Sequence, residues 1–177
     1  MTNACSNNIV IIGRATVDAL EGSYARAFRR LGFSVTVFDN PRSLRRSVRL
    51  GKVGEVINTF WPCQPWIAKA NRELLTTVFE QRPDIVIVDE PVTGLDPVHA
   101  FSAMARLAAW AAQGRTVIAS LHDLTLAARY AGRILALKQG RVAGEGALTP
   151  ALIRDVFGVE SEIRGTGTSA KVDFLLP

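Results

Sequence analysis

Three titratable side chains follow two strand-like apolar runs. The run DIVIVDE ends in the adjacent carboxylates Asp89 and Glu90, and His122 follows the run RTVIASL. The carboxyl ends of parallel strands lie at one edge of a sheet, where open α/β sheets bind ligands. One carboxylate there can hold a hydrated magnesium ion, and the next can orient and deprotonate a water that attacks a phosphoryl group. The imidazole can hydrogen-bond a γ-phosphate. For carboxylates at a strand end, a structural or helix-capping role is the alternative.

Short β-rich runs alternate with longer helix-like stretches, which is typical of a parallel sheet covered by helices. The runs are apolar without strict alternation, as in strands buried on both faces. Strands are predicted at 8–13, 33–39, 84–90, 115–121 and 133–140, and helices at 22–31, 67–80, 98–113, 124–130 and 150–157. The predicted fold is one doubly wound α/β domain, Rossmann-like or P-loop-NTPase-like, with about five parallel strands and helices on both faces. Right-handed crossovers allow the strand order 2-1-3-4-5 or 3-2-1-4-5.

Two further segments carry local signals. RVAGEG follows Gln139 and Gly140, so these two residues are predicted to form the turn of a small hairpin. Trp and Pro residues in 41–66 favour an ordered loop there. The pattern does not decide whether the tail 165–177 is ordered.

The composition excludes several classes of protein. Of 177 residues, 48% are hydrophobic and 21% charged, as in ordinary globular domains and unlike disordered or fibrous chains. No apolar stretch approaches the roughly 20 residues that span a bilayer, so we expect no membrane insertion. No basic residue precedes the short apolar run Ile9–Ile12, which is unlike a secretory signal peptide. Cys5 and Cys63 are too few for a disulfide framework. Together these features predict a cytoplasmic protein.

The net charge of +5 comes from one half of the chain. Residues 1–88 hold 12 Lys and Arg against 7 Asp and Glu, whereas residues 89–177 hold 9 of each. Much of the excess lies in one segment, at Arg42, Arg45, Arg46, Arg49 and Lys52. We interpret it as a solvated surface segment, with contact to phosphate or anionic lipid as the alternative. Because no nucleic-acid module signature accompanies it, no nucleic-acid partner is expected.

The second half of the chain resembles the ATPase subunits of ABC transporters. DEPVTGLDP is similar to their Walker B strand and D-loop, and SLHDL to their switch histidine. The remainder is similar to the C-terminal part of ATPases that serve iron-siderophore, haem and cobalamin importers, from about Pro83 onward. The resemblance implies Mg²⁺ and ATP as cofactors. It implies Asp89 as the magnesium carboxylate, Glu90 as the catalytic base, Asp96 as the D-loop residue and His122 as the γ-phosphate contact.

The phosphate-gripping motifs of that family do not occur in the sequence. GxxxxGK[ST], whose amides cradle the phosphates, is absent, and KANRELLTTVFEQRP stands where LSGGQ is expected. No Q-loop can be placed either. Phosphoryl transfer depends on that positioning and charge stabilisation, so we expect ATP hydrolysis to be absent or near background. Coupling to a permease is not expected.

The first half resembles a different family. The succession NIVIIG, LEGSYARAFRRLGFSVTVFDN and ANRELLTTVFEQRPDIVIV is similar to the N-terminal Rossmann-like domain of GT-B glycosyltransferases. Shared βαβ architecture is the alternative, and the GxGxxG fingerprint of dinucleotide sites is lacking. The resemblance implies nucleotide-sugar or acceptor binding around Gly13, Gly22 and Ser23, although the last two could instead cap a helix.

The two resemblances meet inside the strand PDIVIV, so the chain is interpreted as a chimera. Its single domain would combine a glycosyltransferase-like half, 1–88, with an ABC-ATPase-like half, 89–177. Natural fusion, deliberate recombination and an assembly artefact would look alike. Three functions stay open: an ABC-ATPase-derived domain, a glycosyltransferase-like binding domain, and a folded domain with no ligand. The oligomeric state is not predicted.

Overall fold

The computed structural model describes residues 7–13, 20–39, 72–74, 76–78 and 80–175. The chain forms two compact units, one of Met1–Asp89 with Trp110–Ala119 and the other of Glu90–Ala109 with Ser120–Pro177. The predictions for the basic segment, the loop at 41–66 and the two cysteines lie outside the described residues. Within the described residues, no helix is long and apolar enough to cross a membrane.

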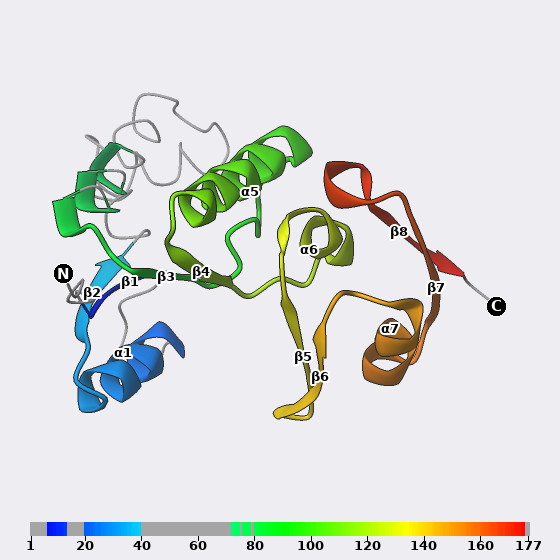
Figure 1. Ribbon diagram of the computed structural model, residues 1–177, viewed down its shortest axis with the longest axis horizontal. Helices are drawn as coiled ribbons and strands as arrows, with labels where there is room; N and C mark the ends of the chain where they lie inside the picture. Colours follow the sequence, from blue (N-terminus) through cyan, green and yellow to red (C-terminus); the bar gives the residue numbers. More distant parts are fainter. Residues whose placement is uncertain (1–6, 14–19, 40–71, 75, 79, 176–177) are drawn as a thin grey trace, which may run out of the picture. The chain divides into compact units, whose positions relative to one another are not determined.

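The first unit is built on a parallel four-stranded sheet (Figure 1). Its strands are β1 (Asn8–Gly13), β2 (Ser34–Asp39), β3 (Ile85–Val88) and β4 (Thr116–Ala119). They pair in the order β2-β1-β3-β4. This confirms the predicted α/β class and the first four positions of the order 2-1-3-4-5.

The core of this unit lies around β1, whose residues Ile9–Ile12 are all buried. One face is covered by α1 (Leu20–Arg30), which places Ala25 against Ile9, Ile11 and Ile87. The helical residues at 72–74, 76–78 and 80–81 lie on the opposite side of the sheet (Figure 1). Burial on both sides explains why the run NIVIIG shows no polar alternation.

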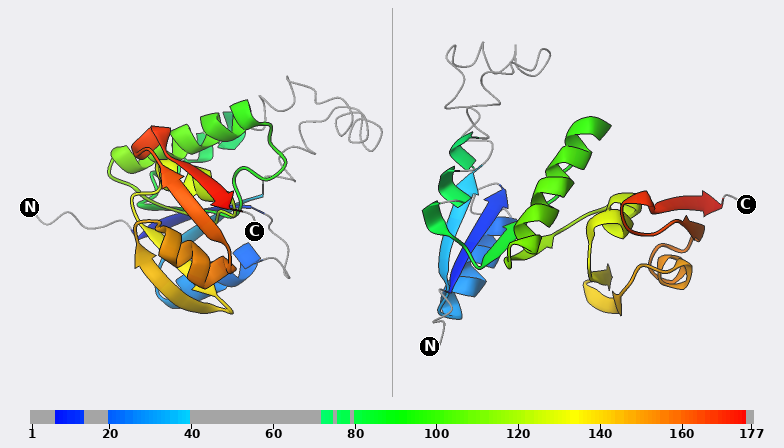
Figure 2. Two further views of the ribbon diagram at one scale, coloured as in Figure 1. Left: turned by 90° about the vertical axis from the view of Figure 1, so that its right-hand side faces the viewer. Right: turned by 45° about the horizontal axis from the view of Figure 1, so that its top comes forward.

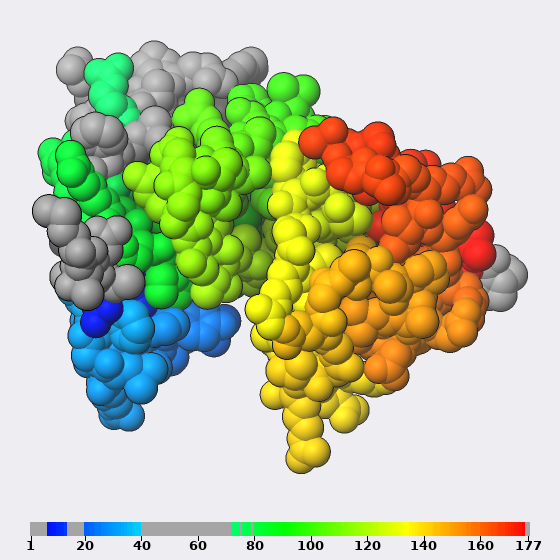
Figure 3. Space-filling model, in the orientation of Figure 1, coloured from blue at the N-terminus to red at the C-terminus, as the bar shows by residue number. Residues whose placement is uncertain are grey.

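The predicted fifth parallel strand is wrong. Strand β5 (Ile134–Lys138) pairs antiparallel with β6 (Arg141–Gly146) in a separate two-stranded sheet. The predicted hairpin is confirmed, because Gln139 and Gly140 have φ of 50° and 74°, as a two-residue primed turn requires. The hairpin lies at the surface (Figure 3), where Leu135 and Leu137 remain more than half exposed. A strand that exposes alternate apolar residues does not meet the two-sided burial of a central parallel strand.

The second unit contains two short helices and a C-terminal hairpin (Figure 2). The helices are α6 (Leu124–Tyr130) and α7 (Pro150–Phe157), both as predicted. Helix α7 begins after the N-cap Thr149 and ends at Gly158, whose φ of 71° suits a glycine C-cap. The 3₁₀ turn η1 (Gly167–Ser169) joins β7 (Glu160–Arg164) to β8 (Lys171–Leu175). The residues of the tail up to Leu175 thus form regular structure.

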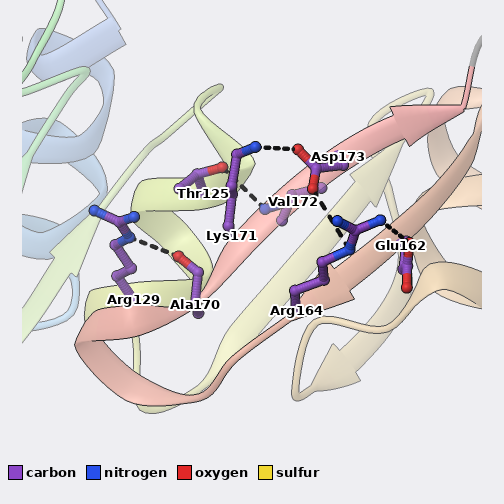
Figure 4. Close-up of polar contacts among 8 residues, drawn as sticks. All are labelled: Thr125, Arg129, Glu162, Arg164, Ala170, Lys171, Val172 and Asp173. Atoms are coloured by element: carbon purple, nitrogen blue, oxygen red, sulfur yellow. Dashed lines mark hydrogen bonds and ion pairs between the residues drawn. The ribbon is translucent and has the colours of Figure 1, made fainter.

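Helix α6 is bonded to the C-terminal hairpin (Figure 4). The Val172 amide donates to Thr125 Oγ1 at 3.2 Å, and Arg129 Nε donates to the Ala170 carbonyl at 2.6 Å. The Arg129 guanidinium also stacks over Phe101 of α5 (Pro97–Ala112), 5.1 Å from the ring centroid. These contacts fix α6, whose N-cap residue Asp123 directly follows His122.

Candidate functional site

Glu90 and His122 follow the carboxyl ends of two neighbouring strands, β3 and β4. Strands β3 and β4 run parallel with Val88 opposite Ala119, so the residues that follow each strand start from neighbouring positions. Asp89 is the first residue after β3 and is partly buried. The structure brings Glu90 and His122 together, with Oε1 of the carboxylate 3.8 Å from Nδ1 of the imidazole. Both side chains are more than half exposed to solvent.

Two hydroxyl groups hold Glu90. Its backbone N–H donates to Oγ of Ser120 at 2.8 Å, and its Oε2 accepts a hydrogen bond from Oγ1 of Thr93 at 2.9 Å. The backbone of Glu90 has φ of 43°, in the left-handed region that non-glycine residues seldom occupy. One carboxylate oxygen is therefore bonded within the loop, and the other faces His122.

Asp96 caps helix α5. Its Oδ1 accepts from the His99 amide at 3.1 Å, and its carbonyl accepts from the Ala100 amide at 2.9 Å. Its Oδ2 lies 2.5 Å from His99 Nδ1. The side-chain hydrogen bond from His99 is the main reason that the pKa of Asp96 lies below its usual range. The described geometry thus assigns Asp96 a capping role, and its D-loop role stays a prediction.

The glycine-loop residues of the first half lie in the other unit. Helix α1 begins at Leu20, so Gly22 and Ser23 stand inside its first turn and do not cap it. The Ser23 hydroxyl accepts a hydrogen bond from Arg26 at 2.9 Å. Gly13 ends β1, where the buried side chain of Glu21 occupies the space that a side chain at position 13 would need. A carboxylate already near the helix N-terminus opposes a second anion there, and ligand binding by this loop remains a prediction.

Sequence reasoning missed Thr93 and Ser120. Thr93 lies three residues after Glu90 in a turn, with its amide bonded to the Glu90 carbonyl at 3.2 Å. Ser120 is the first residue after β4, 30 positions from Glu90, and only the strand register indicates its role. A hydroxyl directly after a strand that pairs with the carboxylate strand could have served as a signal.

The described residues contain no group of three or more His, Cys, Asp and Glu side chains that could hold a metal ion. Magnesium commonly keeps several waters and uses one or two carboxylates, so a site at Asp89 does not require such a group. Asp89, the partly buried carboxylate that directly follows β3, is chemically suited to be that single magnesium ligand.

Comparison with known proteins identifies homologues for about half of the chain. The phosphonates import ATP-binding protein PhnC of Ruegeria pomeroyi is 34% identical over 108 residues, which are 59% of this chain and 40% of that protein. The hemin import ATP-binding protein HmuV of Rhodopseudomonas palustris is 41% identical over 102 residues, 55% of this chain and 37% of that protein. The chain spans about two fifths of the length of these curated relatives. No protein-family model matches.

A solved ATP binding subunit of an ABC transporter is 19% identical and covers 85% of this chain and 82% of its own, with a TM-score of 0.39. The homologues found by sequence are ABC transporter ATP-binding proteins. Neither of the two relatives named above is a glycosyltransferase, and the resemblance of residues 8–88 to that family is unsupported.

Proposed function

Because about half of the chain has ABC transporter ATP-binding proteins as homologues, we propose that it is an ABC-ATPase-derived domain that contacts magnesium and nucleotide weakly without turnover. The observation that carries the proposal is the approach of Glu90 to His122, at 3.8 Å, where β3 and β4 end. Open parallel sheets bind ligands at this edge.

Each residue has a chemical role in the proposal. Asp89 would hold the hydrated magnesium ion, which supplies positive charge against the phosphate oxygens. His122 would donate a hydrogen bond to the terminal phosphate. Glu90 would orient a water next to it, through the carboxylate oxygen that Thr93 leaves unbonded. Asp96 would contribute indirectly, because it caps the helix that begins after the same loop.

The absence of turnover is proposed from the sequence. No stretch of the 177 residues matches GxxxxGK[ST], so the backbone cradle and lysine that grip a triphosphate have no counterpart. Without them, the charge that develops in phosphoryl transfer lacks its main stabilisation. Because neither a signature motif nor a Q-loop can be placed, we also propose that this chain does not couple to a permease.

Thermal unfolding with and without ligand tests nucleotide contact. A ligand that binds only the native state stabilises it, by about 1.4 kcal/mol at a ligand concentration ten times the dissociation constant. For a chain of this size, that corresponds to a midpoint increase of roughly 3–6 °C. We expect the increase with magnesium-ATP, and we expect it to be lost without magnesium and in Asp89→Asn. Asp155→Asn, which removes an exposed carboxylate in α7, is the matched control.

Two other outcomes would contradict the proposal. An unshifted midpoint at saturating magnesium-ATP would show that no workable nucleotide site exists. A shift with a UDP-sugar that disappears in Gly22→Val would favour the glycosyltransferase-like alternative. Turnover is tested separately by phosphate release: magnesium-dependent release that is lost in Glu90→Gln would overturn the proposed inactivity.

A further inference from the structure

Glu90 occupies a backbone conformation that its side chain disfavours. Three described non-glycine residues have positive φ, and one of them, Gln139, stands in a hairpin turn that requires it. Glu90 is in no such hairpin, yet its φ is 43°. Residues in this region persist only where their surroundings hold them, and they cluster at functional sites. The contacts that hold Glu90 therefore bear on what its carboxylate does.

Two hydroxyl contacts act on different parts of Glu90. Ser120 accepts the hydrogen bond of the Glu90 amide at 2.8 Å, which ties the residues after β3 to those after β4. Thr93 donates to Oε2 at 2.9 Å, which fixes the rotation of the carboxylate. The remaining oxygen, Oε1, faces Nδ1 of His122 at 3.8 Å. The contact with Ser120 fixes the backbone position from which the Glu90 side chain extends. The contact with Thr93 occupies Oε2 and leaves Oε1 on the side of His122.

We propose that Ser120 and Thr93 are positioning residues that direct Oε1 of Glu90 to His122, Ser120 through the backbone and Thr93 through the carboxylate. The inference deepens the proposed function and rests on it, because the same carboxylate and imidazole form the suggested nucleotide site. In this proposal each hydroxyl acts through Glu90.

Nuclear magnetic resonance on the full chain tests the inference without nucleotide. The sequence has two histidines, His99 and His122, so each ring signal is assigned by replacing one of them. His99 lies against Asp96 and serves as an internal reference. At fixed pH, Ser120→Ala and Thr93→Val should each move the His122 ring signals and leave those of His99 in place. Ser120→Thr and Thr93→Ser, which keep the hydroxyl, should retain the wild-type spectrum.

Amide exchange gives a second measurement that separates the two contacts. Loss of one hydrogen bond should make the Glu90 amide exchange about fivefold faster in Ser120→Ala, and Thr93→Val should leave that rate within twofold. Ser102→Ala, which removes an exposed hydroxyl on α5, is the matched control and should alter neither reading. Unchanged His122 signals in both variants, or equal movement of His99, would overturn the inference.

Magnesium-ATP then separates this inference from the proposed function. If wild type shows a midpoint shift, Ser120→Ala and Thr93→Val should reduce it at least twofold, and a full shift in both would contradict a positioning role. If wild type shows no shift, the proposed function fails, and the histidine spectra still decide whether the hydroxyls position Glu90.

Discussion

Gly13→Ala should destabilise the sheet of the first unit. A Cβ at position 13 would lie 2.0 Å from Glu21 Oε1, 2.6 Å from its Cγ and 2.7 Å from its Cδ, whereas ordinary contacts are 3.4–4 Å. Because three atoms of Glu21 are too close and its side chain is buried, the whole side chain must move rather than its tip. Overpacking of this kind costs about 1–3 kcal/mol.

The lost glycine offsets part of that cost. Replacing a glycine such as Gly13, at the end of a strand, by alanine contributes about 0.5–1 kcal/mol of stability through the lower entropy of the unfolded chain. The net loss is therefore at most about 2.5 kcal/mol and about 1 kcal/mol at the middle of both ranges, which corresponds to a decrease in midpoint of roughly 2–4 °C for a chain of this size. Urea unfolding followed by circular dichroism measures it, and amide exchange at Ile11 reports on the sheet.

Two further variants identify the cause. Gly132→Ala is the matched control, because nothing lies within 4 Å of its Cβ position, and it should be neutral or slightly stabilising. Glu21→Ala removes the clashing atoms, so Gly13→Ala should cost less in that background, which a double-mutant cycle measures as coupling. If Gly13→Ala is as stable as Gly132→Ala, or the cycle shows no coupling, the close approach of Glu21 to Gly13 is refuted.

Two predictions concern helix termini. The pKa of Asp96 is lowered by His99, so the ionised cap contributes stability above the usual aspartate value of 3.8 and loses it as pH falls through the lower folded-state value. Acid unfolding should therefore show that wild type is more stable than Asp96→Asn, by a difference that shrinks on acidification. A difference that does not depend on pH would contradict a stabilising role of the ionised Asp96 carboxylate. Thr149→Ala removes the hydroxyl that accepts the Leu152 amide at 3.2 Å and should destabilise α7 by about 0.5–2 kcal/mol in urea unfolding, whereas Thr149→Ser should be nearly neutral.

Much of the fold follows from local sequence. The apolar run NIVIIG predicts β1 with its bounds, because a strand buried on both faces needs no polar alternation. Asp123 and the following Leu, Ala and Arg residues mark α6, whose bounds 124–130 are as predicted. The turn residues Gln139 and Gly140 predict the β5–β6 hairpin. The C-terminal β7–β8 hairpin was not predicted, although the alternation of charged with other residues in ESEIR and KVDFL is typical of half-exposed strands. Its connection, at 165–170, is longer than a two-residue turn.

The sequence by itself determined the strand ends that bear Asp89, Glu90 and His122, because strand-forming runs and the residues after them are local properties. Only the tertiary structure decided that β5 leaves the parallel sheet, and that Glu21 fills the space above Gly13. It also placed Ser120 on the Glu90 amide, 30 positions away, through the register of Val88 with Ala119. Strand register and the φ of the residues after a strand depend on which strands pair and on how the following loops connect them. A local pattern of residues therefore predicts neither.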